Sequence, residues 1–183
     1  AVTPAWRSVS PMSVGRRHLN TTILPDGQIL VTGGSAAPGF DEPAGAVLFA
    51  ELWNPATERW TPLASHSRYR GYHSTALLLP DARVLIAGGG HPNPPGGVAE
   101  NNAEIFSPPY LFKGARPAIT AAPTVLRYGQ PFVVETSPAG GIAAVTLVRL
   151  SSVTHAFNEN QRINALSFTG SGSTLTVTPP ANA

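Results

Sequence analysis

The sequence predicts an all-β protein in which short antiparallel strands are joined by tight turns. Glycine and proline together make up 18 + 19 = 37 of the 183 residues, a share that suits turns between short strands better than long helices. Two further observations support this class. A unit of roughly fifty residues occurs twice in succession, and a series of closely spaced β-prone segments follows it.

The composition excludes several classes of partner. The chain carries 12 Lys and Arg against 10 Asp and Glu, a formal net charge of +2. No run of basic residues is present, so the sequence offers no electrostatic footprint for nucleic acid. No apolar segment approaches the ~20 residues that cross a bilayer, and nothing resembles a signal peptide. Since cysteine is absent, disulfides and thiolate sites within this chain are excluded. We expect a soluble β-protein that binds neither nucleic acid nor membrane.

The repeat appears when residues 18–34, HLNTTILPDGQILVTGG, are set against residues 73–89, HSTALLLPDARVLIAGG. At an offset of 73 − 18 = 55, the histidine, Leu-Pro-Asp and Gly-Gly coincide. Residues 50–55, AELWNP, match residues 103–108, AEIFSP, at an offset of 53. The two-residue difference falls in the loop after each glycine pair, so both units are expected to be one module used twice.

Each module is predicted to be a β-meander. A short β-prone run, a proline-containing turn and a return strand that ends at the glycine pair precede a third strand. In the first module, residues 58–64 supply a fourth strand. This pattern is typical of a kelch propeller blade. Two blades cannot close a propeller of 4–8 blades, so we expect this chain to be a fragment that associates with the remainder of its own propeller; a processed mature protein is the alternative.

The repeat stops at a stretch that contains Pro108, Pro109, Gly114 and Pro117, and a domain boundary is predicted near residues 112–118. We assign residues 1–113 to the last kelch blades and residues 114–183 to an immunoglobulin-like β-sandwich. Its predicted strands are residues 131–137, 143–152, 164–170 and 173–180. Four or five strands are fewer than the roughly seven of such a domain, so the sandwich is expected to be truncated.

Four segments carry a resemblance to a known family: RGYHSTALLLPDARVLIAGGG, AENNAEIFSPPYL, RPAI and SSVTHAFNENQR, in that order. They resemble the C-terminal part of the copper radical oxidases, the galactose oxidase and glyoxal oxidase family. The resemblance implies a seven-bladed kelch propeller followed by an all-β domain, from which a loop or hairpin reaches the metal. It also implies a secreted enzyme that oxidises a primary alcohol or aldehyde with O2 to give H2O2.

The resemblance implies a copper ion whose two imidazole ligands are His73 and His155, with Tyr72 as the axial phenol and base. The remaining ligand, a tyrosine joined to a cysteine that holds the radical, is expected upstream of this chain. Copper(II) favours imidazole and oxygen donors. Metal binding lowers the pKa of a phenol, and the resulting phenolate can accept an alcohol proton. Adjacent residues of a regular strand point to opposite faces. Tyr72 and His73 therefore require an irregular strand start after Gly71.

Other side chains have a functional and a plain structural interpretation. Phe40, in the loop PGFDEP, is a predicted contact on the substrate rim, with packing as the alternative. Arg70 and Arg162 either orient carbonyls and acids beside the ligand segments or form ordinary surface pairs.

The remaining histidines are assigned no ligand role: His18 is expected to be a residue of the blade or to lie just outside the metal ligands, and His66 and His91 are expected to face solvent. The competing function is a non-catalytic kelch propeller with a β-sandwich that binds carbohydrate or cell-wall polymer. A cysteine and a tyrosine placed upstream to cross-link would separate the oxidase from this alternative.

Overall fold

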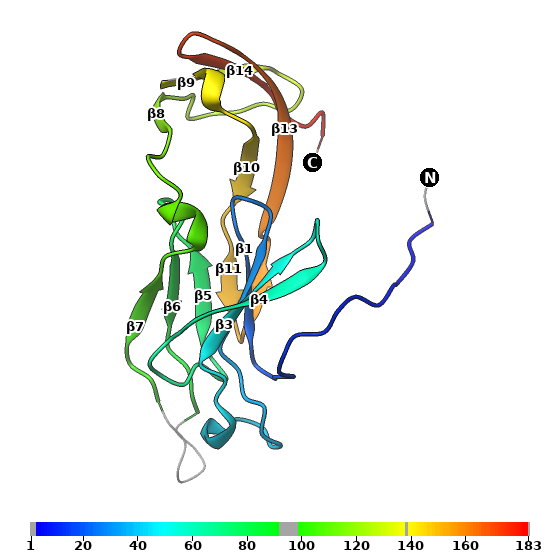
Figure 1. Ribbon diagram of the computed structural model, residues 1–183, viewed down its shortest axis with the longest axis vertical. Helices are drawn as coiled ribbons and strands as arrows, with labels where there is room; N and C mark the ends of the chain where they lie inside the picture. The colour runs from blue at the N-terminus through cyan, green and yellow to red at the C-terminus, as the bar shows by residue number, and fades with distance from the viewer. Residues whose placement is uncertain (1–2, 92–98, 138, 183) are drawn as a thin grey trace. The chain divides into compact units, whose positions relative to one another are not determined.

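The structure, a computed structural model, describes residues 3–91, 99–137 and 139–182, and contains only strands and short 3-10 turns in these ranges. The prediction of an all-β protein is confirmed. The chain forms two compact units: Ala1–Ser107 with Leu150–Gln161, and Pro108–Arg149 with Arg162–Ala183 (Figure 1). In the described ranges, no helix is long and apolar enough to cross a membrane.

The first module folds into a four-stranded antiparallel sheet in chain order. Its strands are β1 (Asn20–Ile23), β2 (Ile29–Thr32), β3 (Phe49–Asn54) and β4 (Arg59–Ser65). The Pro-Asp-Gly turn is closed by Leu24, whose N–H donates to the Gln28 carbonyl at 2.8 Å. Gly27 adopts a φ of 83° there, which glycine accepts without steric cost. A 3-10 turn, η1 (Pro43–Gly45), lies in the loop before β3.

The second module repeats this meander with three strands. They are β5 (Thr75–Leu78), β6 (Val84–Ala87) and β7 (Ala103–Phe106). Burial alternates along β5 and β6, so that Ala76, Leu78, Val84 and Ile86 point into the core. The predicted meander is confirmed in both modules, whereas their assignment as kelch blades stays a prediction.

The second unit contains one five-stranded sheet. Its order is β10 (Val145–Arg149), β13 (Arg162–Ser171), β14 (Thr174–Thr178), β9 (Phe132–Ser137) and β8 (Ala118–Ala121). The 3-10 turns η2 (Pro109–Phe112) and η3 (Ala139–Gly141) complete it. The core contains Val134, Ala139, Leu166, Leu175 and Val177. The second sheet of the predicted sandwich is not found among the residues described in this unit.

A hairpin between β10 and β13 belongs to the first unit. It consists of β11 (Ser152–Thr154) and β12 (Phe157–Glu159) and contacts β1 and β5 (Figure 1). Gln161 fixes it: the Ile23 N–H donates to Gln161 Oε1 at 2.8 Å, and Gln161 Nε2 donates to the Ile23 carbonyl at 2.9 Å. Asn158 Nδ2 also donates to the Thr21 carbonyl at 2.8 Å. Side chains of the hairpin segment therefore bind the backbone of β1.

Candidate functional site

Tyr72 and His73 lie in a tight turn immediately before β5. The Ser74 N–H donates to the Gly71 carbonyl at 3.0 Å, and His73 has a φ of 62°, in the left-handed region. The alternation of a regular strand does not apply there, and the two rings lie side by side with centroids 3.8 Å apart. The predicted irregular strand start is confirmed.

His155 lies at the tip of the β11–β12 hairpin. The two loop residues, His155 and Ala156, have φ values of 54° and 63°, the signs of a type I′ turn, for which Asn-Gly is the usual sequence. A residue with a side chain in this region costs about 1–3 kcal/mol and persists only where its surroundings hold it. Here the paired strands and the bonds from Gln161 provide that support.

The hairpin brings His155 to the turn that carries Tyr72 and His73. The His155 ring centroid lies 4.9 Å from that of His73 and 5.8 Å from that of Tyr72. His155 Nδ1 shares a hydrogen bond of 2.7 Å with Thr154 Oγ1, which leaves Nε2 available for a ligand bond. The structure thus brings together all three residues of the predicted ligand set.

This donor set fits copper. Two imidazoles and a phenol are nitrogen and oxygen donors of the type that copper(II) prefers. Both histidines are exposed and Tyr72 is half-buried, so an ion can reach the cluster. In the part of the chain that the structure describes, no three His, Cys, Asp or Glu side chains are grouped to hold a metal. The donors that this cluster offers a metal are therefore the imidazoles of His73 and His155 and the phenol of Tyr72.

Three more rings surround Tyr72. Centroid distances from Tyr72 are 4.7 Å to Phe40, 5.3 Å to His18 and 6.2 Å to His91. Phe40 meets Tyr72 at an interplanar angle of 61° and is 58% exposed, so the predicted rim residue lies at the cluster, while its role stays a prediction. The expectation that His91 faces solvent is wrong, because its half-buried ring lies 6.5 Å from that of His73.

Asp41 fixes the turn and was not identified from the sequence. Asp41 Oδ1 accepts the hydroxyl of Tyr69 at 2.5 Å and the N–H of Tyr72 at 3.1 Å. Burial, together with the bond to Asp41, raises the pKa of Tyr69 far above its usual range. A Cβ on Gly71 would collide with both the Tyr69 hydroxyl and Asp41. The one feature of the sequence that could have pointed to Asp41 was its position directly after Phe40, the predicted rim residue.

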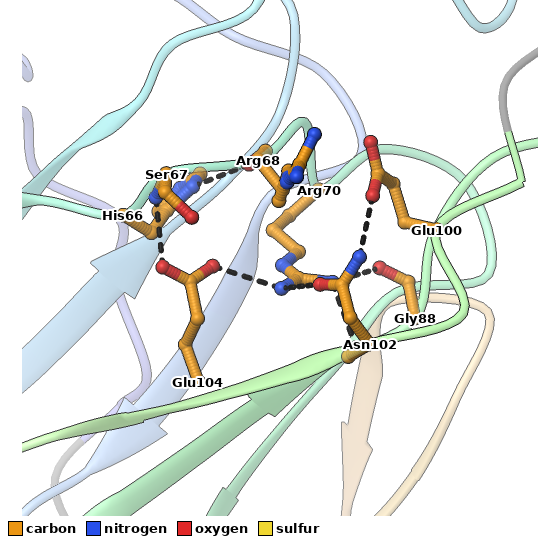
Figure 2. Close-up of polar contacts among 8 residues, drawn as sticks. All are labelled: His66, Ser67, Arg68, Arg70, Gly88, Glu100, Asn102 and Glu104. Carbon is orange, nitrogen blue, oxygen red and sulfur yellow. Dashed lines mark hydrogen bonds and ion pairs between the residues drawn. The ribbon is translucent and has the colours of Figure 1, made fainter.

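Arg70 anchors the segment before the turn to the second sheet (Figure 2). Its side chain is 1% exposed and donates to the carbonyls of Gly88 and Asn102, to Asn102 Oδ1, and to Glu104 Oε2 at 2.8 Å. Burial raises the pKa of Glu104, but hydrogen bonds from Ser67 and Arg70 outweigh it and hold the pKa below its usual value. Of the two interpretations of Arg70, the one in which it orients carbonyls and pairs with an acid is correct.

His66 belongs to the group of polar side chains around Arg70 and Glu104 (Figure 2). The expectation that it faces solvent is wrong: it is 8% exposed, and its Nδ1 lies 2.6 Å from the Arg68 carbonyl oxygen. Burial lowers the pKa of His66. The Pro- and Ser-rich sequence around His66 gave no sign of this burial.

The comparisons with known proteins agree with this architecture. Residues 116–183 match the family described as galactose oxidase-like, Early set domain. The chain is 35% identical to aldehyde oxidase GLOX of Vitis pseudoreticulata, over 87% of this chain and 33% of that protein. It is 32% identical to a galactose oxidase of Gibberella zeae, over 86% of this chain and 24% of that protein.

A solved structure shares the fold of nearly the whole chain. It is a fungal alcohol oxidase of the AA5 family in complex with copper, with a TM-score of 0.87 and 31% identity, covering 96% of this chain and 38% of that one. The second unit thus contains a domain of the immunoglobulin-like Early set class. Residues 116–183 belong to the galactose oxidase-like family, and the resemblance to the copper radical oxidases is confirmed. The chain spans a third or less of the two curated relatives named here.

Proposed function

We propose that this chain is the C-terminal part of a secreted copper radical oxidase that oxidises primary alcohols or aldehydes with O2 to give H2O2. The observation that carries the proposal is the convergence of Tyr72, His73 and His155 at one place. In this proposal, residues 1–113 are the last kelch blades of a seven-bladed propeller and residues 114–183 are an immunoglobulin-like domain. The copper-bound fungal alcohol oxidase of the same fold supports this assignment.

His73 and His155 would hold the copper ion through imidazole nitrogens, and Tyr72 through its phenolic oxygen. The bound copper, together with a tyrosine–cysteine radical cofactor supplied from outside this chain, provides one-electron redox chemistry. The chain's own contribution to catalysis is the phenolate of Tyr72, which accepts the proton of the substrate hydroxyl. The bond from the Tyr72 N–H to Asp41 holds this residue in its turn.

Phe40 would form the wall beside the reacting group. Its exposed ring packs against that of Tyr72 with centroids 4.7 Å apart, where it can contact the carbon skeleton of a substrate while the hydroxyl faces the phenol. Because the loop that carries Phe40 also carries Asp41, the wall and the proton acceptor are fixed by one short segment.

The test uses the complete protein that contains this chain. Copper titration and H2O2 production from a primary alcohol are compared for the wild type and for Tyr72→Phe, His73→Ala and His155→Ala. The histidine variants are expected to lose copper affinity. Tyr72→Phe is expected to retain bound copper with a kcat about 10²–10⁴-fold lower, the usual contribution of a positioned base. Unchanged copper affinity in both histidine variants would contradict the site and leave the non-catalytic, carbohydrate-binding propeller as the better interpretation.

A further inference from the structure

The positive charge of this protein is concentrated in its second unit. That unit contains Lys113, Arg116, Arg127, Arg149 and Arg162 but a single acid, Glu135, which gives 5 − 1 = +4. The whole chain is +2, so the first unit is 2 − 4 = −2. A domain with such an excess of one sign concentrates ligands of the opposite sign near its surface. The second unit is therefore suited to an anionic ligand.

Three of these five cations line one pocket. A cavity of about 420 Å³ lies within the second unit, and Arg127, Arg149 and Arg162 contribute to its wall together with Tyr128, Asn164 and Asn182. Leucine, valine and proline side chains supply the rest of the lining. The volume falls within the roughly 300–1,000 Å³ of small-molecule sites.

The arrangement of the arginines favours an anion. Arg149 and Arg162 are directly opposite each other on the paired strands β10 and β13, a position in which like charges destabilise a sheet. Arg16 and Arg70 of the first unit each pair with a glutamate. In contrast, none of the three pocket arginines forms an ion pair with an acid in the described part of the chain. A bound carboxylate would neutralise this repulsion.

The remainder of the pocket suits a sugar. The Gly129 N–H donates to the Pro180 carbonyl at 2.9 Å and so ties together the two loops of the rim. Tyr128, on one of these loops, is 61% exposed and can stack on the C–H face of a sugar ring. The amides of Asn164 and Asn182 can bond hydroxyls, while guanidinium groups bind carboxylates in bidentate fashion.

We propose that this pocket binds an oligosaccharide that carries carboxylates. The guanidinium groups recognise the acidic substituents, and Tyr128 with the asparagine amides recognises the ring and its hydroxyls. The proposal does not depend on copper, because every lining residue belongs to the second unit whereas the ligand cluster belongs to the first.

The test is isothermal titration of the complete protein, with and without a copper chelator, using a trimer of galacturonic acid and the neutral galactose trimer. The acidic trimer is expected to bind in both conditions, more weakly as salt is raised, and the neutral trimer at least about ten-fold more weakly. Arg149→Gln and Arg162→Gln should each weaken binding about ten-fold or more, the usual effect of losing a charged hydrogen bond. Lys113→Gln makes the same charge change outside the pocket and should leave binding unchanged.

A second comparison separates saccharide recognition from simple anion binding. Tyr128→Ala should weaken the acidic trimer but not inorganic phosphate. Absence of trimer binding, or an equal loss in Lys113→Gln, would overturn the site. Equal affinity for phosphate and trimer, with no effect of Tyr128→Ala, would overturn the saccharide assignment. Absence of oxidase activity in the copper-loaded complete protein, with trimer binding intact, would contradict the copper proposal alone.

Discussion

The two modules of the first unit share one anchor. In the first, Arg16 donates to the carbonyls of Gly33 and Phe49 and pairs with Glu51. In the second, Arg70 donates to the carbonyls of Gly88 and Asn102 and pairs with Glu104. The partners correspond under the repeat, since 88 − 33 = 55 and 104 − 51 = 53. Each module therefore uses a buried arginine to fix the segment before its first strand.

The modules differ by one residue between that arginine and the histidine that follows it. The separation is 18 − 16 = 2 in the first and 73 − 70 = 3 in the second. Both histidines have left-handed backbones, with φ of 55° and 62°. The longer segment holds Gly71 and Tyr72 where the first module has only Arg17. The repeat supplies the scaffold, and a single inserted residue adds a phenol beside the histidine.

The largest expected effect is the loss of an anchor acid. Arg16 and Glu51 side chains are 0% and 1% exposed, so Glu51→Ala leaves a buried charge unpaired and should cost about 3–5 kcal/mol of unfolding free energy. Glu104 is 28% exposed, so water can partly replace it, and Glu104→Ala should cost about 2 kcal/mol. Urea denaturation of both variants measures the difference. Equal losses of unfolding free energy, or the reverse order, would show that the burial of the acid does not determine how much each anchor stabilises the fold.

A smaller effect is expected at the inserted segment. A Cβ on Gly71 would overlap Tyr69 and Asp41, so Gly71→Ala should cost about 1–3 kcal/mol through forced displacement. The control is Gly15→Ala, three residues before His18, where nothing lies within 4 Å. That variant should stay within about 0.5 kcal/mol of the wild type. Wild-type stability in Gly71→Ala would mean that the turn is not tightly fixed.

The smallest effect concerns His66, which lies near Glu104 of the second anchor. Burial lowers its pKa below the ordinary value of 6.5, so the unfolded chain takes up a proton at a higher pH than the folded one. The resulting stability is complete above about pH 6.5 and declines as the pH falls toward the lower, folded pKa. Unfolding free energies between pH 7.5 and pH 5 should show a shallower decline in His66→Gln. Identical pH dependence in both proteins would contradict the account.

The repeated pattern made most of the fold predictable. The Leu-Pro-Asp and Gly-Gly motifs that coincide in the two repeats predicted where both meanders lie, and the segment 58–64 predicted β4. Alternating segments gave β9, β10, β13 and β14. These signals are local, since both the residues that favour turns and the alternation of buried and exposed side chains in a strand depend on neighbours in the sequence. The resemblance to the copper radical oxidases identified Tyr72, His73 and His155 as one site. Their spacing in the sequence alone would not have grouped them.

The remaining contacts depend on residues distant in sequence. Asp41 binds Tyr72 from a loop of the first module, and Gln161 holds the hairpin through the backbone of Ile23. His66 is buried, whereas the sequence suggested an exposed loop. None of these partners is adjacent in sequence, so only the folded chain identifies them.

The most direct test of the inserted-residue account is copper titration of the complete protein in two matched variants, His18→Ala and His73→Ala. Both remove a histidine with the same backbone conformation at the same place in the repeat. We expect His18→Ala to bind one copper with nearly wild-type affinity, whereas His73→Ala should lose at least about 100-fold in copper affinity. Equal losses in the two variants, or copper binding that survives in His73→Ala, would contradict this expectation.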